Sequence, residues 1–371
     1  MKTIVNDLGD ITPSYPVENL ENPDKIIFLD IETTGFTAKS SNLYLIGCAY
    51  HENDEWHTIQ WLAENYDEEV MVLNAFLEFC LNYNFIIHFN GNRFDLPYIT
   101  QKCEMYDIPF QFDDFKGVDL YKRIKPYKNF LKLENCKQTT IETFLGVKRD
   151  DQYTGGELIN FYHDYACSHD EENERLLLLH NKEDLIGMLD LLSVMGISDL
   201  FNLPIRVMKV QANYYNDYNN KKRQELVLNL RFLSEIPVPI SYSANGCYFT
   251  GNGVNGVLKV PLYEEEMKYY YSNYRDYYYL PEEDMAIHKS VAASVDPDHR
   301  RQATAATCYT RKVSSYLPQW EPIFTPFFKR SYRDHDYFFE LTDEFKTSRK
   351  SFNDYAEHVL QNMVIAEDEI R

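Results

Sequence analysis

The stretch KIIFLDIETTGF, residues 25–36, places two acidic residues at the end of an apolar run. A run rich in Ile, Phe and Leu is typical of a strand at the buried centre of a sheet. Because residues i and i+2 of a strand point to the same face, Asp30 and Glu32 project together. Two neighbouring carboxylates repel each other, and an unpaired buried charge is costly. The pattern therefore predicts a shared proton, a basic partner or a metal ion, unless both acids simply reach solvent.

Two later segments supply further candidates for the same cluster. Asp95 lies in HFNGNRFDLPYI, where it follows an apolar strand and a Gly-Asn turn and opens a helix. His180 and Asp184 lie four residues apart in HNKEDLIGML, so a helix places both on one face, and Gly187 is expected to leave that face open. Taken singly, such an Asp is most often a helix N-cap, and such a His–Asp pair most often lies on the surface. The combination is what predicts a catalytic cluster.

The three segments resemble the motifs of the DEDD exonucleases of the ribonuclease-H-like superfamily. DIETTG is similar to the first motif, FNGNRFDLP is similar to the second, and HNKED stands where the third is found. The resemblance covers roughly residues 24–196, and the form HN-x-x-D is most similar to the YprB-like bacterial group. Many members place Tyr four residues before the last Asp, and others place His five before it, whereas this chain has His180 four before Asp184. The departure concerns the general base and not the metal ligands.

The resemblance implies a metal-dependent 3′–5′ exonuclease that hydrolyses phosphodiester bonds of DNA or RNA. It implies two Mg²⁺ or Mn²⁺ ions, with Asp30 as the bridging ligand, Glu32 and Asp184 on the first ion and Asp95 on the second. Two ions can activate water and stabilise both oxygens of the displacement, and oxygen ligands suit Mg²⁺ or Mn²⁺ rather than zinc. His180, with an unperturbed pKa of about 6.5, would accept the proton of the attacking water. The alternative for His180 is a structural hydrogen bond to a carboxylate.

The charge distribution bears on the expected partner, the 3′ end of single-stranded nucleic acid. The net charge of −21 argues against non-specific coating of DNA. Residues 1–200 carry 16 basic and 35 acidic residues (−19), whereas residues 201–371 carry 21 and 23 (−2). Residues 116–149 reverse the sign, with nine basic and three acidic residues, and either guide a phosphate backbone or form an ordinary solvated surface. The residues expected to contact nucleic acid are Thr33, Asn90, Asn92, Lys132, Arg300 and Arg301.

In residues 201–371, basic residues cluster beside aromatic ones. Basic groups that follow phosphates, interleaved with rings that stack on bases, form a platform for single strands. The alternative is that the tyrosines pack across strands and the arginines form salt bridges. The basic residues are Lys221, Lys222, Arg223, His299, Arg300, Arg301, Arg311, Lys312, Lys329, Arg330 and Arg333, and the aromatic ones are Tyr214, Tyr215, Tyr309, Phe327, Phe328 and Tyr332.

The predicted elements indicate an α/β class, with a second domain of different texture. The order βββαβα followed by helices is typical of a mixed sheet flanked by helices, and the resemblance makes that domain ribonuclease-H-like. We expect a lead segment over residues 1–23, this domain over 24–198, and a tyrosine-rich, β-rich α+β domain of unknown function over 199–371.

Three local patterns make further expectations. A long helix over residues 171–196 is expected to end at Gly196, and a closing helix is expected over 352–369. GNGVNG, residues 251–256, matches a dinucleotide-binding pattern, but a strand-like run follows it, so a hairpin turn is expected there.

Composition restricts the remaining classes. The sequence contains no uninterrupted run of 18 apolar residues, so no membrane span is expected. The N-terminus lacks the apolar segment of a secretory signal. Seven scattered cysteines without zinc-type spacing indicate reduced thiols and a cytoplasmic location. The alternatives to a nuclease are a catalytically silent nucleic-acid binder or a regulatory protein on the same fold. The presence of all four acids and the histidine favours the nuclease.

Overall fold

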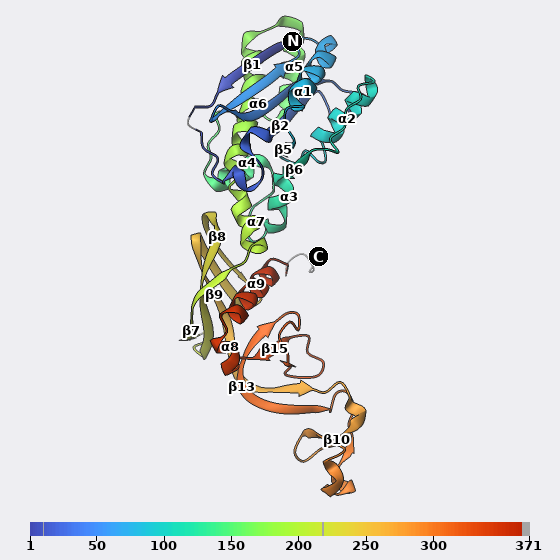
Figure 1. Cartoon of the computed structure of the whole chain (residues 1–371), viewed down its shortest axis with the longest axis vertical. Coiled ribbons are helices and arrows are strands. Elements are labelled where there is room, and N and C mark those ends of the chain that lie inside the picture. Colours follow the sequence, from blue (N-terminus) through green and yellow to red (C-terminus); the bar gives the residue numbers. More distant parts are fainter. Residues whose placement is uncertain (10, 217–218, 366–371) are drawn as a thin grey trace. The chain divides into compact units, whose positions relative to one another are not determined.

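The chain forms two compact units in the computed structural model, which describes residues 1–9, 11–216 and 219–365 (Figure 1). The first unit comprises Met1–Asp199 and Ile236–Val238, and the second comprises Leu200–Glu235 and Pro239–Arg371. Among the described residues, no helix is long and apolar enough to cross a membrane.

The first unit is built on a six-stranded mixed sheet with the strand order β1-β4-β3-β2-β5-β6. The neighbouring pairs from β1 to β2 in this order are antiparallel. The strands β5 and β6 run parallel to β2. The strand β2 lies inside the sheet and is buried along most of its length, as its apolar run predicts. Residues 1–23, expected as a lead segment, contribute the edge strand β1. The strands are β1 (Lys2–Asp7), β2 (Ile26–Thr33), β3 (Leu43–Glu52), β4 (Glu55–Leu62), β5 (Phe85–His88) and β6 (Lys116–Asp119).

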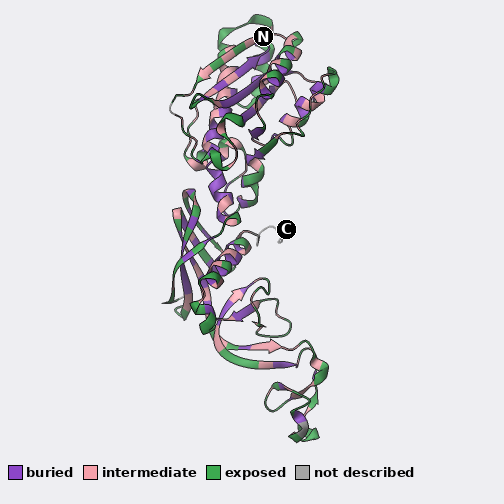
Figure 2. Cartoon of the chain, viewed as in Figure 1, coloured by how far each residue is buried: buried purple, intermediate pink, exposed green. Residues whose placement is uncertain are grey.

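Helices flank this sheet and bury its apolar side chains, which Figure 2 shows as buried segments along the central strands. Tyr44 of β3 stacks on Tyr162 of α5 with ring centroids 4.1 Å apart, and both rings are fully buried. The α-helices are α1 (Glu69–Cys80), α2 (Asp95–Met105), α3 (Leu120–Ile124), α4 (Gln138–Leu145), α5 (Gly155–Ser168), α6 (Glu171–Leu191) and α7 (Val194–Asn202). Short 3₁₀ turns occupy Val17–Asn19, Pro23–Lys25, Tyr66–Glu68 and Lys125–Tyr127.

The helix α6 lies close against the sheet because β3 carries a glycine beneath it. Gly47 pairs with Asp30 across β2 and β3, and a Cβ atom at Gly47 would lie 2.0 Å from the Asn181 side-chain oxygen. A larger residue at that position would have to displace the side chains of Asn181 and Leu185. The close approach brings the polar side chains of α6 next to the end of β2.

Two expectations about α6 are wrong. The helix ends at Leu191 and not at Gly196, because the chain turns at Leu192 and a separate helix, α7, contains Gly196. Gly187 does not leave an open face, since a Cβ atom there would lie 2.1 Å from Glu142 Oε1. The helix α4 covers this part of α6, and Gly187 permits that contact.

The second unit contains a six-stranded sheet with the order β14-β15-β13-β9-β8-β7 and a three-stranded sheet with the order β11-β10-β12. Its strands are β7 (Arg206–Asn216), β8 (Lys222–Ala244), β9 (Cys247–Tyr270), β10 (Tyr277–Leu280), β11 (Met285–His288), β12 (Arg301–Gln302), β13 (Tyr309–Gln319), β14 (Phe327–Phe328) and β15 (Tyr337–Glu340). Its helices are α8 (Asp343–Thr347) and α9 (Arg349–Ile365), with 3₁₀ turns at Tyr274–Asp276, Ala292–Ser294 and Pro297–His299. The unit is therefore β-rich, as expected.

The expected turn at residues 251–256 is wrong, because these residues continue β9. The turn lies instead between β8 and β9, where Asn245 and Gly246 have φ angles of 53° and 74°. Gly256 is needed for packing: a Cβ atom there would lie 2.7 Å from Phe232 Cζ. The closing helix is present as α9, and the last part of its predicted span, residues 366–369, lies outside the described residues.

Candidate active site

The end of β2 presents both of its carboxylates to α6. Asp30 accepts a hydrogen bond of 2.8 Å from the side-chain amide of Asn181, and Glu32 lies beside His180. Glu32 is only 9% exposed, so its carboxylate is not simply solvated. The two acids therefore share one face, as the strand period predicts.

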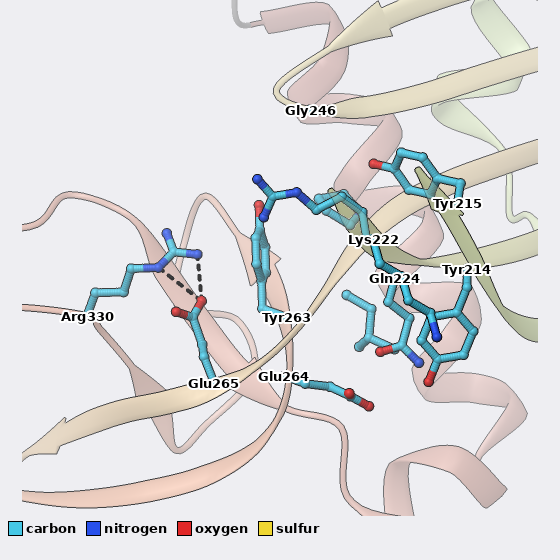
Figure 3. A pocket seen from close by; sticks show the side chains of 12 residues that line it. Tyr214, Tyr215, Lys222, Gln224, Gly246, Tyr263, Glu264, Glu265 and Arg330 are labelled. Carbon is cyan, nitrogen blue, oxygen red and sulfur yellow. Dashed lines mark hydrogen bonds and ion pairs between the residues drawn. The ribbon is translucent and has the colours of Figure 1, made fainter. Parts of the chain in front are cut away.

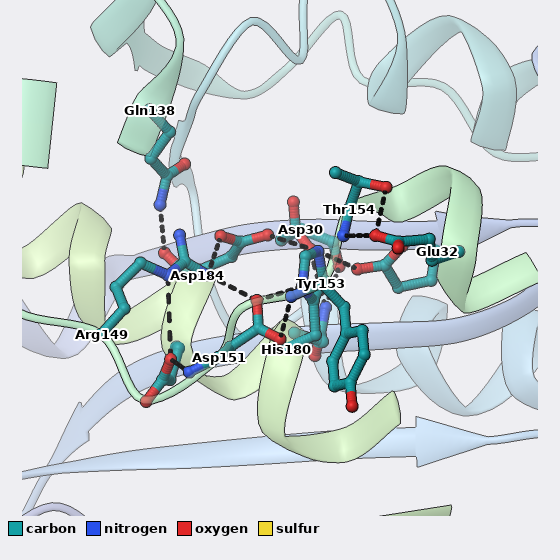
Figure 4. A network of polar contacts seen from close by, with 12 residues as sticks. Asp30, Glu32, Gln138, Arg149, Asp151, Tyr153, Thr154, His180 and Asp184 are labelled. Atoms are coloured by element: carbon teal, nitrogen blue, oxygen red, sulfur yellow. Dashed lines mark hydrogen bonds and ion pairs between the residues drawn. The ribbon is translucent and has the colours of Figure 1, made fainter. Parts of the chain in front are cut away.

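His180 and Asp184 complete a compact group with Glu32 (Figure 4). His180 Nε2 lies 3.6 Å from Glu32 Oε1 and 3.5 Å from Asp184 Oδ2. One ligand atom from each of the three residues lies within 4.8 Å of the other two, a spacing that can hold a metal ion. The i, i+4 spacing on α6 thus positions the histidine and the aspartate as the sequence suggests.

Asp95 approaches the same region from the parallel half of the sheet. It is the first residue of α2 and is 6% exposed. The turn before it contains Asn90 in a left-handed conformation, with φ of 61°. The charge of Asp95 raises the pKa of Asp30, so the two carboxylates interact electrostatically.

Burial and mutual repulsion hold protons on these acids. Burial raises the pKa of Glu32 to about 8 and that of Asp95 to about 7, and the neighbouring carboxylates add to both shifts. Burial and the charges of Asp184, Glu32 and Asp95 raise the pKa of Asp30 well above its usual value. For His180, burial lowers the pKa, but attraction to Glu32, Asp184 and Asp151 outweighs it, so the pKa is raised. The cluster therefore needs either protons or a bound cation.

Neighbouring side chains orient the cluster through hydrogen bonds. None of them was predicted to have a role in the site. Asn181 holds Asp30 through its amide group, while its own side-chain oxygen accepts a 2.8 Å bond from Gln60. Asp151 lies 2.7 Å from His180 Nδ1, so that nitrogen can donate to the carboxylate while Nε2 faces the acids. Asn181 lies inside the HNKED motif, and its position one residue after His180 is a signal that could have pointed to it.

Arg149 supplies the positive charge beside the cluster. Its guanidinium lies 2.6 Å from Asp184 Oδ1 and 3.2 Å from Glu142 Oε2. The carboxylate of Glu183 accepts the backbone N–H groups of Asp150 and Asp151, so residues 149–151 are fastened along α6. Arg149 was counted in the basic segment 116–149, but it is 11% exposed and points inward. No local pattern distinguishes it from the solvated lysines around it.

The remaining residues expected to contact nucleic acid do not join this group of side chains. The Thr33 hydroxyl donates to the Gly35 carbonyl, and the Asn90 N–H donates to Asp119. Asn92 lines a groove along α2, and Lys132 is exposed on a loop. Arg300 and Arg301 belong to the second unit.

Several basic residues of the second unit are neutralised by carboxylates of the same unit. Lys312 lies 2.6 Å from Glu340, and Arg330 lies 2.7 Å from Glu265. Arg311 lies 3.4 Å from Glu266, and His299 Nδ1 lies 3.0 Å from Glu282. The Arg300 guanidinium stacks 4.8 Å from the Tyr278 ring centre and donates to the Ala292 carbonyl. These positions support the salt-bridge interpretation of much of the predicted platform.

Residues 27–195 match the RNase_H_2 family model of the RNase_H superfamily. With the mixed sheet and its flanking helices, this match gives the first unit a ribonuclease-H-like fold. No curated protein matches the chain.

Two solved structures are similar to parts of the chain. One is a family B DNA polymerase from the hyperthermophilic archaeon Pyrobaculum calidifontis, with a TM-score of 0.38 and 13% identity over 69% of this chain and 35% of the polymerase. The other is a zinc-bound E. coli ExoI–ssDNA complex, with a TM-score of 0.27 and 11% identity over 57% of this chain and 55% of ExoI. The chain thus covers less than two thirds of the length of either.

The raised pKa of Glu32 predicts how stability depends on pH in the absence of metal. An acid with a folded-state pKa of about 8 and an unfolded value of 4.5 destabilises the fold increasingly as the pH rises between those values. Glu32→Gln should therefore raise the free energy of unfolding by on the order of 3 kcal/mol at pH 8 and by less than about 1 kcal/mol at pH 5. Urea titrations in EDTA measure this. Glu172→Gln, an exposed control at the start of α6, should give no gain, and an equal gain at both pH values for Glu32→Gln would contradict the prediction.

The ion pairs of Arg149 predict a large effect of its removal. Arg149→Met leaves the charges of Glu142 and Asp184 without a partner in a mostly buried setting, which should cost about 3 kcal/mol of unfolding free energy at pH 7. Denaturant titration without metal measures the loss. The matched control is Arg175→Met, since Arg175 and its partner Glu172 are 57% and 62% exposed, and its cost should stay below about 1 kcal/mol. Equal losses in the two variants would show that Arg149 is not a buried counter-charge.

Proposed function

We propose that this protein is a metal-dependent nuclease that hydrolyses phosphodiester bonds of DNA or RNA as a 3′–5′ exonuclease. The observation that carries the proposal is the convergence of Glu32, His180 and Asp184 beside Asp30 on a ribonuclease-H-like fold. The buried Asp95 adds the fourth carboxylate. The direction of cleavage rests on the resemblance of the three motifs to the DEDD exonucleases.

The donor set fits a hard divalent cation. Glu32, Asp184 and His180 offer two carboxylates and one imidazole within 4.8 Å, and carboxylates favour Mg²⁺ or Mn²⁺. Asp30 and Asp95 are the residues that would bridge to and hold a second ion. The raised pKa values of Asp30, Glu32 and Asp95 reflect burial of the charged groups and, in addition, repulsion between carboxylates that a cation would relieve. Ions of this kind supply an activated water and neutralise the charge that develops on the phosphate.

The chain's own residues position this chemistry. Arg149 holds one oxygen of Asp184, so that the other faces Glu32 and His180. Asp151 fixes the His180 ring through Nδ1. His180 Nε2 then points into the cluster, where it is placed to accept the proton of the attacking water. The alternative role of His180 is to serve as a third ligand of the metal ion, beside Glu32 and Asp184.

Substitution of the carboxylates tests the proposed function. With Mn²⁺ and a 5′-labelled single strand, the protein should produce a ladder that shortens from the 3′ end. Asp30→Asn and Asp184→Asn should each lower the cleavage rate by more than about 100-fold, since loss of partners that only orient metal ligands already costs about 10–100-fold. Asp54→Asn, in the exposed turn between β3 and β4, is the control and should cleave normally. Full activity in Asp30→Asn would refute the site, and release of nucleotides from the 5′ end would refute the polarity.

Metal binding should also be visible without any substrate. Mn²⁺ at 100 times its dissociation constant should stabilise the folded protein by about 2.7 kcal/mol, because the unfolded chain lacks the cluster. A thermal melt with and without EDTA measures the shift. The increase in melting temperature should be absent from an Asp30→Ala, Asp184→Ala double variant and preserved in a variant with Asp113→Ala and Asp114→Ala, two exposed acids. An unchanged increase in the first double variant would place the ion elsewhere.

A further inference from the structure

We propose that the second unit binds single-stranded nucleic acid in a groove formed by the β7–β8 hairpin and the facing part of β9. The inference rests on the proposed function, because the strand held there would be the substrate of the first unit. It identifies a place in the second unit, and a ligand chemistry, that the fold of the first unit does not provide.

The groove is a hollow of about 770 Å³, and the residues that line it all belong to the second unit (Figure 3). Three tyrosines and three basic residues line it together with Glu264 and Glu265: Tyr214, Tyr215, Lys222, Arg223, Tyr263 and Arg330. Its volume lies in the range of ordinary ligand-binding clefts. The groove therefore combines rings and cations in one concave surface.

The tyrosines of β7 leave much of their surface free. Tyr214 is 54% exposed and Tyr215 is 42% exposed, on a strand that is paired only along β8. Large exposed rings at a sheet edge gain nothing from the protein core, but every nucleic-acid base offers a flat face on which they can stack. The Lys222 ammonium already lies 4.3 Å from the centre of the Tyr214 ring, so a cation stands next to the stacking surface.

The hairpin has the positive charge that a phosphate backbone requires. Residues 205–224 contain five basic residues and one acid, a net charge of +4 in a chain of −21. The basic residues are Arg206, Lys209, Lys221, Lys222 and Arg223, and the acid is Asp217. Such a local reversal attracts a polyanion in spite of the overall charge.

The facing wall carries one basic side chain, Arg330, and two acidic ones, Glu264 and Glu265. Arg330 is bonded to Glu265 and stacks 4.7 Å from the centre of the Tyr263 ring. Attraction for phosphate therefore comes from the hairpin, while the wall supplies shape and another ring. The expected contacts at Arg300 and Arg301 are not needed for this arrangement, since Arg300 already contacts Tyr278 and the Ala292 carbonyl.

Binding without cleavage tests the groove separately from the nuclease. The Asp30→Asn protein in EDTA is titrated against fluorescein-labelled 20-nucleotide strands of dT or U, and anisotropy is recorded at several salt concentrations. Tyr214→Ala with Tyr215→Ala should weaken binding by roughly tenfold or more, because each stacked base contributes about 1–3 kcal/mol. Lys222→Ala with Arg223→Ala should reduce the slope of log K against log salt by about 1.4, the value for two lost phosphate contacts on a single strand.

Matched controls use residues of the same kind outside the groove. Tyr332→Ala removes a ring that is 46% exposed, and Lys312→Ala removes a lysine that is paired with Glu340; both should bind like the parent. Strands carrying 4-thiouridine, irradiated with the Asp30→Asn protein, should crosslink to the segment that contains Tyr214 and Tyr215. This measurement leaves the groove unmutated and is decisive even where a double variant fails to fold.

The outcomes separate the groove from the nuclease activity. Unchanged affinity and salt slope in both groove variants, or crosslinks confined to the first unit, would overturn the groove and leave a protein-binding or structural role for the hairpin. A protein that binds through the groove but does not cleave would refute the proposed nuclease and support the inference. A protein that cleaves nucleic acid, but whose groove variants bind it like the parent, would support the proposed nuclease and refute the groove.

Discussion

The repulsion between carboxylates gathered at the buried end of β2 is the constraint around which the first unit is organised. A sheet centre is a poor place for charge, and the pKa values of Asp30, Glu32 and Asp95 all rise there because burial penalises the ionised form. The protein keeps these groups in spite of that cost. Among the described residues, Asp30 has only the amide of Asn181 as a side-chain partner, whereas Glu32 lies beside the basic side chain of His180. Strongly shifted pKa values of this kind often mark functional sites.

The counter-charge is placed at one side of the cluster and not at its centre. One terminal nitrogen of the Arg149 guanidinium contacts Asp184 Oδ1, and the other contacts Glu142 Oε2 on α4. Asp184 Oδ2 and Glu32 Oε1 remain directed toward His180 Nε2. Arg149 and Asp151 therefore support Asp184 and His180 from one side, while Asp184 Oδ2 and His180 Nε2 point toward each other and toward Glu32.

Sequence alone predicted the parts of this site that follow a local period. Asp30 and Glu32 are related by the strand period of two, and His180 and Asp184 by the helix period, so their shared faces could be read directly. Arg149 and Asp151 could not be assigned in this way, because they lie outside the helices and their partners Asp184 and His180 are about 30 residues later on α6. The same limit explains the error at residues 251–256, where pairing of β9 in a long sheet overrides a glycine-rich pattern that locally favours a turn. Gly196 was misread for a similar reason, since the interruption of the helix at Leu192 has no glycine or proline to mark it.

The close approach of α6 to the sheet at Gly47 affects the orientation of Asp30 as well as packing. The residue has no side chain and lies on a different strand from the acids, yet the position of Asn181, which holds Asp30, depends on its being this small. A Cβ atom at this point would collide with the side chains of Asn181 and Leu185, so any added bulk would disturb the amide that holds Asp30. The packing of α6 and the orientation of Asp30 are therefore both constrained at this one position.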